Sequence, residues 1–180
     1  MRYFIISDIH GSAFYLAKAL EQFKSGSYDY LVILGDILYH GPRNTIPEGY
    51  NPSEVVALLN PMANQIIACR GNCEAEVDQM LLSFPCLSDY SLIVDGKVSF
   101  FATHGHLYTS EHFPKSPGKS IFLSGHTHLW LLEKQGDIIA CNPGSITFPK
   151  EGRPHTYATY EDGILSIKDL EGKVLSSLEV

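Results

Sequence analysis

The chain has few cysteines, few basic residues and no long apolar run, and each shortage argues against a class of protein. Four cysteines, none in a CxxC spacing, predict reduced thiols and no disulfide framework. Thirteen Lys and Arg against 20 Asp and Glu give a net charge of −7, which disfavours a long nucleic acid or an anionic membrane as partner. No apolar run approaches the length of a membrane span, and Met1 leads directly into a strand-like segment without a signal-peptide pattern. We therefore expect a cytoplasmic protein that does not bind membranes; a small anion held by bound metal remains compatible with the charge.

The length and composition suit a single compact domain. The chain has 180 residues, of which 44% are hydrophobic and 18% charged, and it contains no internal repeat and no low-complexity tract. We expect one domain over residues 1–180.

Six short apolar segments each run into a cluster of histidine, aspartate, asparagine or glycine. They are YFIIS before DIHG, YLVIL before GD, QIIAC before RGNCE, VSFFAT before HGH, SIFLS before GHTH, and DIIAC before NPGS. Apolar runs of this length are typical of buried strands, and in layered α/β folds reactive groups gather beyond the carboxyl ends of strands. All six motifs should therefore face one rim.

The first half of the chain alternates strands with helices. Helices are expected at residues 12–26, 51–60 and 75–84. Ser12 is a candidate N-cap for the first, and Asn51 followed by Pro52 is a good start for the second. This alternation predicts βαβ units before about residue 84.

The second half changes to hairpins. Turns are expected at Asp95-Gly96 and near Gly163 and Gly172, so we predict mostly antiparallel strands and two sheets face to face with helices outside. Two long irregular segments, residues 37–50 and 107–119, have the length of functional loops. Glycines that follow the strands, such as Gly125, are expected to permit sharp turns.

Seven side chains at the predicted strand ends can ligate a metal. They are Asp8, His10, Asp36, Asn72, His104, His126 and His128. In extended geometry the two pairs spaced one residue apart, Asp8 with His10 and His126 with His128, each project to one face. One such residue alone could be an ordinary hydrogen-bonded polar side chain, but seven at strand ends are poorly explained in that way. Oxygen and nitrogen ligands without thiolates suit Mn²⁺, Fe²⁺ or Zn²⁺, and a carboxylate can bridge two ions roughly 3.5–4 Å apart.

The ordered motifs DIHG, GD, RGNCE, HGH and GHTH resemble those of the calcineurin-like metallophosphoesterase family. LVILGDILYHGPRN, EVDQMLLSFP and NPGS extend the similarity to its small bacterial phosphodiesterases of the YfcE type, over nearly the whole chain. The resemblance implies an α/β fold: a four-layer αββα sandwich of two mixed sheets flanked by helices, with a binuclear metal centre at the rim. The implied ligand sets are Asp8, His10 and His128 for the first metal and Asn72, His104 and His126 for the second, with Asp36 bridging them.

The resemblance also implies the activity. Two divalent metals, Mn²⁺ first with Zn²⁺, Fe²⁺, Ni²⁺ or Mg²⁺ as alternatives, would hold a hydroxide that attacks the phosphorus of a small phosphodiester. Asp36, Asn72, Cys73 and His104 are the expected catalytic residues. Arg43, Cys73 and His106 are the expected substrate contacts, although Arg43 could equally be a solvent-exposed loop arginine and His106 could orient a ligand.

Cys73 departs from the family pattern, because GNC stands where most members have GNH. It could be a nucleophile, a metal ligand, a redox thiol or a residue that lines the site in place of that histidine, and we favour the last. Nearby cations favour the thiolate and weaken it as an acid, and a thiol offers phosphate no positive charge. The hypothesis is an enzyme that favours phosphodiesters with good leaving groups.

Two other functions remain open from the sequence. One is a phosphomonoesterase of the same fold. The other is a protein-binding scaffold with a vestigial metal site, similar to the retromer subunit that this family resembles. The complete set of metal ligands argues against the scaffold. Apolar strand edges, together with the resemblance, are compatible with a homo-oligomer.

Overall fold

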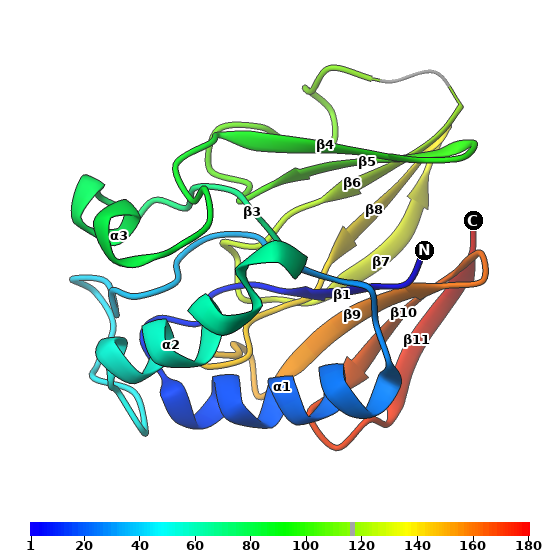
Figure 1. Cartoon of the computed structure of the whole chain (residues 1–180). Coiled ribbons are helices and arrows are strands. Elements are labelled where there is room, and N and C mark those ends of the chain that lie inside the picture. The colour runs from blue at the N-terminus through cyan, green and yellow to red at the C-terminus, as the bar shows by residue number, and fades with distance from the viewer. Residues whose placement is uncertain (116–117) are drawn as a thin grey trace.

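A computed structural model describes residues 1–115 and 118–180 (Figure 1). Its strands form a six-stranded and a five-stranded sheet that pack face to face, as the sequence predicts. The expected loop at residues 107–119 includes residues 116 and 117, which lie outside the described residues. None of the described helices has the length and apolar composition that crossing a bilayer requires.

The six-stranded sheet has the order β11-β10-β9-β1-β2-β3. Its strands are β1 (Tyr3–Ile6), β2 (Tyr30–Ile33), β3 (Ile66–Ala68), β9 (Thr156–Glu161), β10 (Ile164–Asp169) and β11 (Val174–Glu179). The first three are parallel, with Ile5 opposite Val32 and Val32 opposite Ile67, and the last three form antiparallel hairpins that join the sheet beside β1. The predicted βαβ half and the turns near Gly163 and Gly172 are confirmed.

The five-stranded sheet has the order β4-β5-β6-β8-β7. Its strands are β4 (Tyr90–Asp95), β5 (Val98–Thr103), β6 (Lys119–Leu123), β7 (Leu131–Gln135) and β8 (Ile138–Asn142). The prediction of mostly antiparallel strands in the second half is confirmed by the hairpins of both sheets, but β6 pairs in parallel with β5 and with β8. The reason is that the long segment after β5 crosses over rather than turning back, so the three strands end at one rim.

In the part of the chain that the structure describes, four helical segments connect the strands. They are α1 (Ala13–Gly26), α2 (Pro52–Leu59), the 3₁₀ helix η1 (Asn60–Gln65) and α3 (Glu76–Leu81). Both predicted caps are confirmed: the Ser12 hydroxyl accepts the Tyr15 N–H at 3.3 Å, and the Asn51 side chain accepts the Glu54 N–H at 3.2 Å. The third helix is shorter than predicted, because the backbone is already extended at Leu82.

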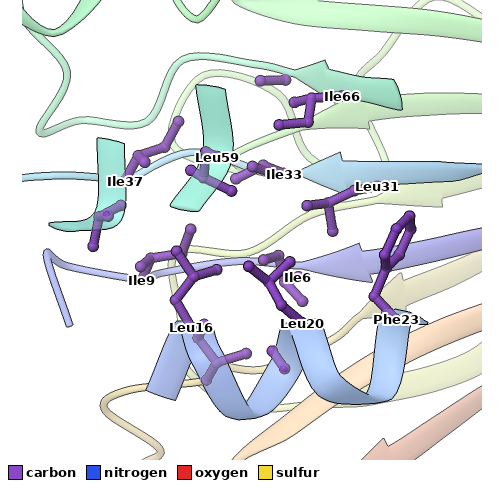
Figure 2. Close-up of a cluster of buried hydrophobic side chains, with 14 of the residues drawn as sticks. Ile6, Ile9, Leu16, Leu20, Phe23, Leu31, Ile33, Ile37, Leu59 and Ile66 are labelled. Carbon is purple, nitrogen blue, oxygen red and sulfur yellow. The ribbon is translucent and has the colours of Figure 1, made fainter. Parts of the chain in front are cut away.

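Alternate residues of β1 face two different cores. Ile6 packs with Leu16 and Leu20 of α1, on the helix side of the sheet (Figure 2). Ile5 points the other way and packs between the two sheets with Ile121 of β6. Because full burial of one such side chain contributes about 1.5–3 kcal/mol, two cores sharing one strand hold the ends of the strands firmly in place.

Helices α1 and α2 form a predicted helical layer on the outer face of the six-stranded sheet (Figure 1). On the outer face of the five-stranded sheet, Phe101 and Phe122 are covered in part by Tyr108 and Phe113 from the loop after β5. The polar motifs lie at the rim where the carboxyl ends of the parallel strands of both sheets meet.

Candidate metal centre

The seven predicted ligands meet where the carboxyl ends of the strands of both sheets converge. The first half of the cluster contains Asp8 and His10, which follow β1, and His128, which lies beyond β6. His128 Nε2 is 3.3 Å from His10 Nε2 and 3.2 Å from Asp8 Oδ1. These ligand atoms lie within 4.8 Å of one another, close enough to bind one cation.

The second half is centred on His104, which follows β5. Its Nε2 atom lies 3.1 Å from Asn72 Oδ1 and 3.2 Å from His126 Nδ1. Asp36 Oδ2 is 3.5 Å from the same nitrogen and 3.7 Å from His10 Nε2, so this carboxylate lies between the two halves. That is the place of a bridging ligand.

The backbone at most of these residues is strained. Among the described residues other than glycine, eight have a positive φ, and five of them are predicted ligands: Asp8 (58°), His10 (49°), Asp36 (55°), His126 (67°) and His128 (63°). The expectation that the spaced pairs project together from extended strands is therefore wrong. β1 ends at Ile6, and left-handed turns then aim each side chain inward. Such conformations cost free energy and persist where the surrounding structure holds them, commonly at functional sites.

Three histidines of the cluster are oriented by backbone carbonyl groups. A carbonyl can only accept, so each Nδ1 carries the hydrogen and each Nε2 is left to face the cluster. The bonds run from His10 to Tyr39 (2.9 Å), from His104 to Leu34 (2.7 Å) and from His128 to Phe148 (2.8 Å). Metal-binding histidines usually have such a partner, because it orients the ring and raises its basicity.

One carboxylate oxygen of Asp8 accepts no hydrogen bond within the described chain, although histidine nitrogens surround it in the middle of the cluster. Oδ2 accepts hydrogen bonds from the Ser7 hydroxyl (2.6 Å) and the His126 N–H (3.0 Å). Oδ1 is buried and accepts no hydrogen bond from any described residue. A buried carboxylate oxygen without a donor is costly unless a cation binds it, so these residues fit a metal.

The pKa values of the cluster also indicate that its carboxylates favour a positive charge beside them. Burial alone would raise the pKa of Asp8, but the imidazole groups of His10 and His128 hold it well below its usual range. Burial alone would lower the pKa of His104, yet Asp36 and Asp8 raise it to about 9. In the metal-free protein, protonated His104 therefore supplies positive charge that bound metal would supply instead.

A cavity of about 560 Å³ opens beside the cluster, and Cys73 and Arg43 line it. The Cys73 N–H donates to Asp36 Oδ1 at 2.9 Å, and its Sγ lies 3.3 Å from Asn72 Nδ2. Burial, followed by the charge of Asp36, raises the pKa of the Cys73 thiol, so it is protonated in the metal-free protein. The thiolate expected from the sequence would need bound metal.

His106 lies beside the cluster but is not among the residues that line the cavity. Its ring centroid is 5.4 Å from that of His104 and 6.2 Å from that of His126. Burial and the neighbouring His104 lower the pKa of His106, which keeps it neutral. Contact between His106 and a substrate stays a prediction.

Glu74 is a positioning residue that the sequence did not single out. Its carboxylate accepts the N–H groups of Asp36 (2.9 Å), Ile37 (2.6 Å) and Gly71. It thus joins the loop of the bridging carboxylate to the loop that carries Asn72. Burial, then the charge of Asp36, raises the pKa of Glu74 to about 7. Only its place at the end of RGNCE hinted at this role.

Two mixed sheets with Asp, Asn and His ligands gathered at their common rim define the metallophosphoesterase class of fold. The profile of the calcineurin-like phosphoesterase superfamily domain matches residues 1–162. The chain belongs to this superfamily, as its motifs predicted.

Named relatives and solved structures agree with this assignment. Phosphodiesterase YfcE of Escherichia coli strain K12 is 44% identical over 167 residues, which cover 93% of this chain and 91% of that protein. The solved structure of the YfcE phosphoesterase from E. coli has a TM-score of 0.96 at 42% identity and covers all of both chains. Vacuolar Protein Sorting 29 from Cryptosporidium parvum has a TM-score of 0.65 at 14% identity, with 99% and 98% of the chains covered, and shares the fold alone.

Proposed function

We propose that this chain is a metal-dependent phosphodiesterase that hydrolyses small phosphodiesters, with all 180 residues acting as one domain. The observation that carries the proposal is the convergence of anchored histidine nitrogens on Asp36 and on Oδ1 of Asp8, a buried oxygen that accepts no hydrogen bond from a described residue. The relation to a protein named phosphodiesterase supports the diester substrate.

The ligands divide into two sets that share one carboxylate. Asp8, His10 and His128 would hold one divalent ion, and Asn72, His104 and His126 the other, with Asp36 between them. When bound, two such ions neutralise phosphate charge and lower the pKa of a nucleophilic water. The chain's own task is to keep the ligands fixed, and the carbonyl partners of three histidines and the Glu74 carboxylate do so.

Residues of the cavity would contact the substrate. Arg43 can hold a phosphate oxygen through its guanidinium group. Cys73 lies beside Asp36 and Asn72 and would face the scissile phosphate or its leaving group.

Several finer assignments belong to the same proposal. Mn²⁺ is the proposed metal, because the ligand set consists of oxygen and nitrogen atoms. A cytoplasmic location is supported by four free cysteines, three of them buried. The excess of acidic residues argues against long nucleic acids and anionic membranes as partners. A homo-oligomer is supported by exposed Leu92 and Val94 on the edge strand β4.

The test begins with metal-free protein. Mn²⁺, Mg²⁺, Zn²⁺ and Ni²⁺ are added back separately, and hydrolysis of bis-p-nitrophenyl phosphate is compared with that of p-nitrophenyl phosphate. We expect metal-dependent cleavage of the diester, with Mn²⁺ most effective, and loss of activity in Asp36→Asn.

The other outcomes point to the alternatives. Preference for the monoester would identify a phosphomonoesterase. Absence of turnover with every metal would overturn the enzymatic proposal and favour the protein-binding scaffold.

A further inference from the structure

The cavity beside the metal centre is basic although the chain is acidic. Apart from the metal-site residues, the charged side chains that line it are Arg43 and Lys150, both cationic. The whole chain has 13 basic and 20 acidic residues, so chance would favour carboxylates here. We propose that Lys150, together with Arg43, selects phosphodiesters that carry a further anionic group on one ester arm. This inference rests on the proposed function and names the substrate class of the same site.

Lys150 is attached to the metal centre through its backbone. Its N–H donates to the His128 carbonyl at 3.3 Å, and the carbonyl of Phe148, two residues earlier, accepts from His128 Nδ1 at 2.8 Å. On the other side, the Arg153 N–H donates to the Lys150 carbonyl at 3.1 Å. The backbone is thus fixed, while the exposed ammonium group forms no ion pair with any described residue.

Arg43 belongs to a different loop, held against the other side of the cluster by His10. The Tyr39 carbonyl accepts from His10 Nδ1 at 2.9 Å, and the His40 carbonyl accepts from Asn44 Nδ2 at 2.8 Å. Within the part of the chain that the structure describes, the Arg43 guanidinium also has no carboxylate partner. Two free cations therefore reach the cavity from two anchored loops.

Arg43 and Lys150 add more positive charge than the single negative charge of a simple diester requires when metal is bound. A diester phosphate carries one negative charge, and metal bound at the Asp8 and Asp36 cluster would already oppose it. Arg43 and Lys150 are exposed whereas His10 and His128 are buried, so the two cations lie outward of the metal centre, where an ester arm would extend. A phosphate or carboxylate on that arm would accept their charge-assisted hydrogen bonds.

The test uses two chromogenic substrates with the same leaving group. One is the p-nitrophenyl ester of thymidine 5′-phosphate, and the other is the same ester with a phosphate on the 3′-hydroxyl. With the Mn²⁺-loaded enzyme, we expect kcat/KM to be about tenfold higher for the substrate with the 3′-phosphate, since charge-assisted hydrogen bonds are about twice as strong as neutral ones. Because screening weakens exposed charges, the preference should fall as NaCl is raised.

Variants assign the preference to residues. Lys150→Gln and Arg43→Gln should each lower the ratio of the two kcat/KM values, while Lys150→Arg should retain it. Lys173→Gln, which removes an exposed lysine from the turn before β11, is the matched control and should leave the ratio as in the parent protein. The ratio is taken within one variant, so a uniform loss of activity cancels.

A binding measurement makes the outcome independent of turnover. Calorimetry should give tighter binding of thymidine 3′,5′-bisphosphate than of thymidine 5′-phosphate to the loaded protein, and Lys150→Gln should narrow the difference. Equal kcat/KM and equal affinity in the parent protein, or a ratio unchanged by Lys150→Gln, would overturn the inference. If neither ester is hydrolysed, the proposed function fails, and calorimetry still decides the charge selection.

Discussion

Cys73 is the side chain at which this site departs most clearly from its family. Its thiol lies beside Asp36 and Asn72 but offers a leaving oxygen no positive charge. An imidazolium could donate both a proton and a charge, and general acid catalysis contributes about 10²–10⁴-fold. We predict that Cys73→His raises kcat/KM for diesters with poor leaving groups at least about tenfold more than for those with good ones.

The measurement is the dependence of kcat/KM on the pKa of the leaving phenol in a series of aryl diesters. Cys73→His should flatten that dependence. Cys73→Ser, which keeps the size but adds no imidazole, should leave it as in the parent protein. The same slope in all three proteins would remove the idea that the thiol limits the choice of substrate.

Glu74 provides a second prediction for a single side chain. Its carboxylate holds the backbones of Asp36 and Gly71, and outer partners of this kind change metal affinity by about 10–100-fold. We predict such a loss of Mn²⁺ affinity in Glu74→Ala, measured by calorimetry, with a smaller loss in Glu74→Gln. Glu171→Ala, at an exposed carboxylate in the turn before β11, is the control. Unchanged affinity in Glu74→Ala would reduce Glu74 to a structural residue of the loop.

The turns after the strands require glycine for two different reasons. Gly105 (φ 105°) and Gly144 (φ 78°) are left-handed, as expected. Gly125 does not have a positive φ; instead, a Cβ atom there would collide with Ser7 Oγ and approach Asp8 Oδ2 to 2.8 Å. The close approach of two loops, rather than a turn conformation, therefore excludes a side chain at Gly125.

Gly125→Ala should accordingly damage the metal centre more than the fold. The added methyl group would displace Asp8, so we predict a loss of Mn²⁺ affinity of at least about tenfold, in the range found for disturbed metal-site neighbours. Gly163→Ala is the matched control: its φ is 80° and no atom lies within 4 Å, so it should cost about 1 kcal/mol of stability and leave affinity unchanged. Equal metal affinity in both variants would contradict the packing argument.

The strand ends were predictable because apolar runs and polar motifs alternate visibly along the chain. The strand β7 could not be predicted, because its sequence LLEKQ has only two apolar residues. It is a strand because it pairs with β8. The parallel pairing of β5 with β6 was also missed, because the described residues of the crossover form no helix and have no periodic pattern. The carbonyl partners of His10 and His104 could not be predicted, since a backbone carbonyl has no sequence signal.

For the molecule as a whole, the buried charges of the site make metal-free stability depend on pH. The pKa of His104 is raised to about 9 from an unfolded value of about 6.5, so its contribution is complete below about 6.5 and is lost as pH rises through about 9. The pKa of Glu74 is raised to about 7, so its ionisation opposes folding between about 4.3 and 7. Both effects predict that the metal-free protein loses stability from mildly acidic to alkaline pH.

Bound metal should offset the part of that trend that comes from His104. A divalent cation needs the neutral imidazole of His104, so binding displaces its proton, and affinity should rise by up to about tenfold per pH unit below pH 9. Since a ligand that binds only the folded state stabilises it by RT ln(1 + [L]/Kd), the Tm difference between Mn²⁺-loaded and metal-free protein should widen with pH. Thermal unfolding of the loaded and the metal-free protein at a series of pH values measures this difference. In His104→Gln the Tm difference should change less with pH than in the parent protein, whereas His112→Gln, at an exposed histidine outside the cluster, should behave like the parent protein. A Tm difference that is constant with pH would mean that His104 is already neutral in the metal-free fold, and that the cluster does not exchange a proton for metal charge.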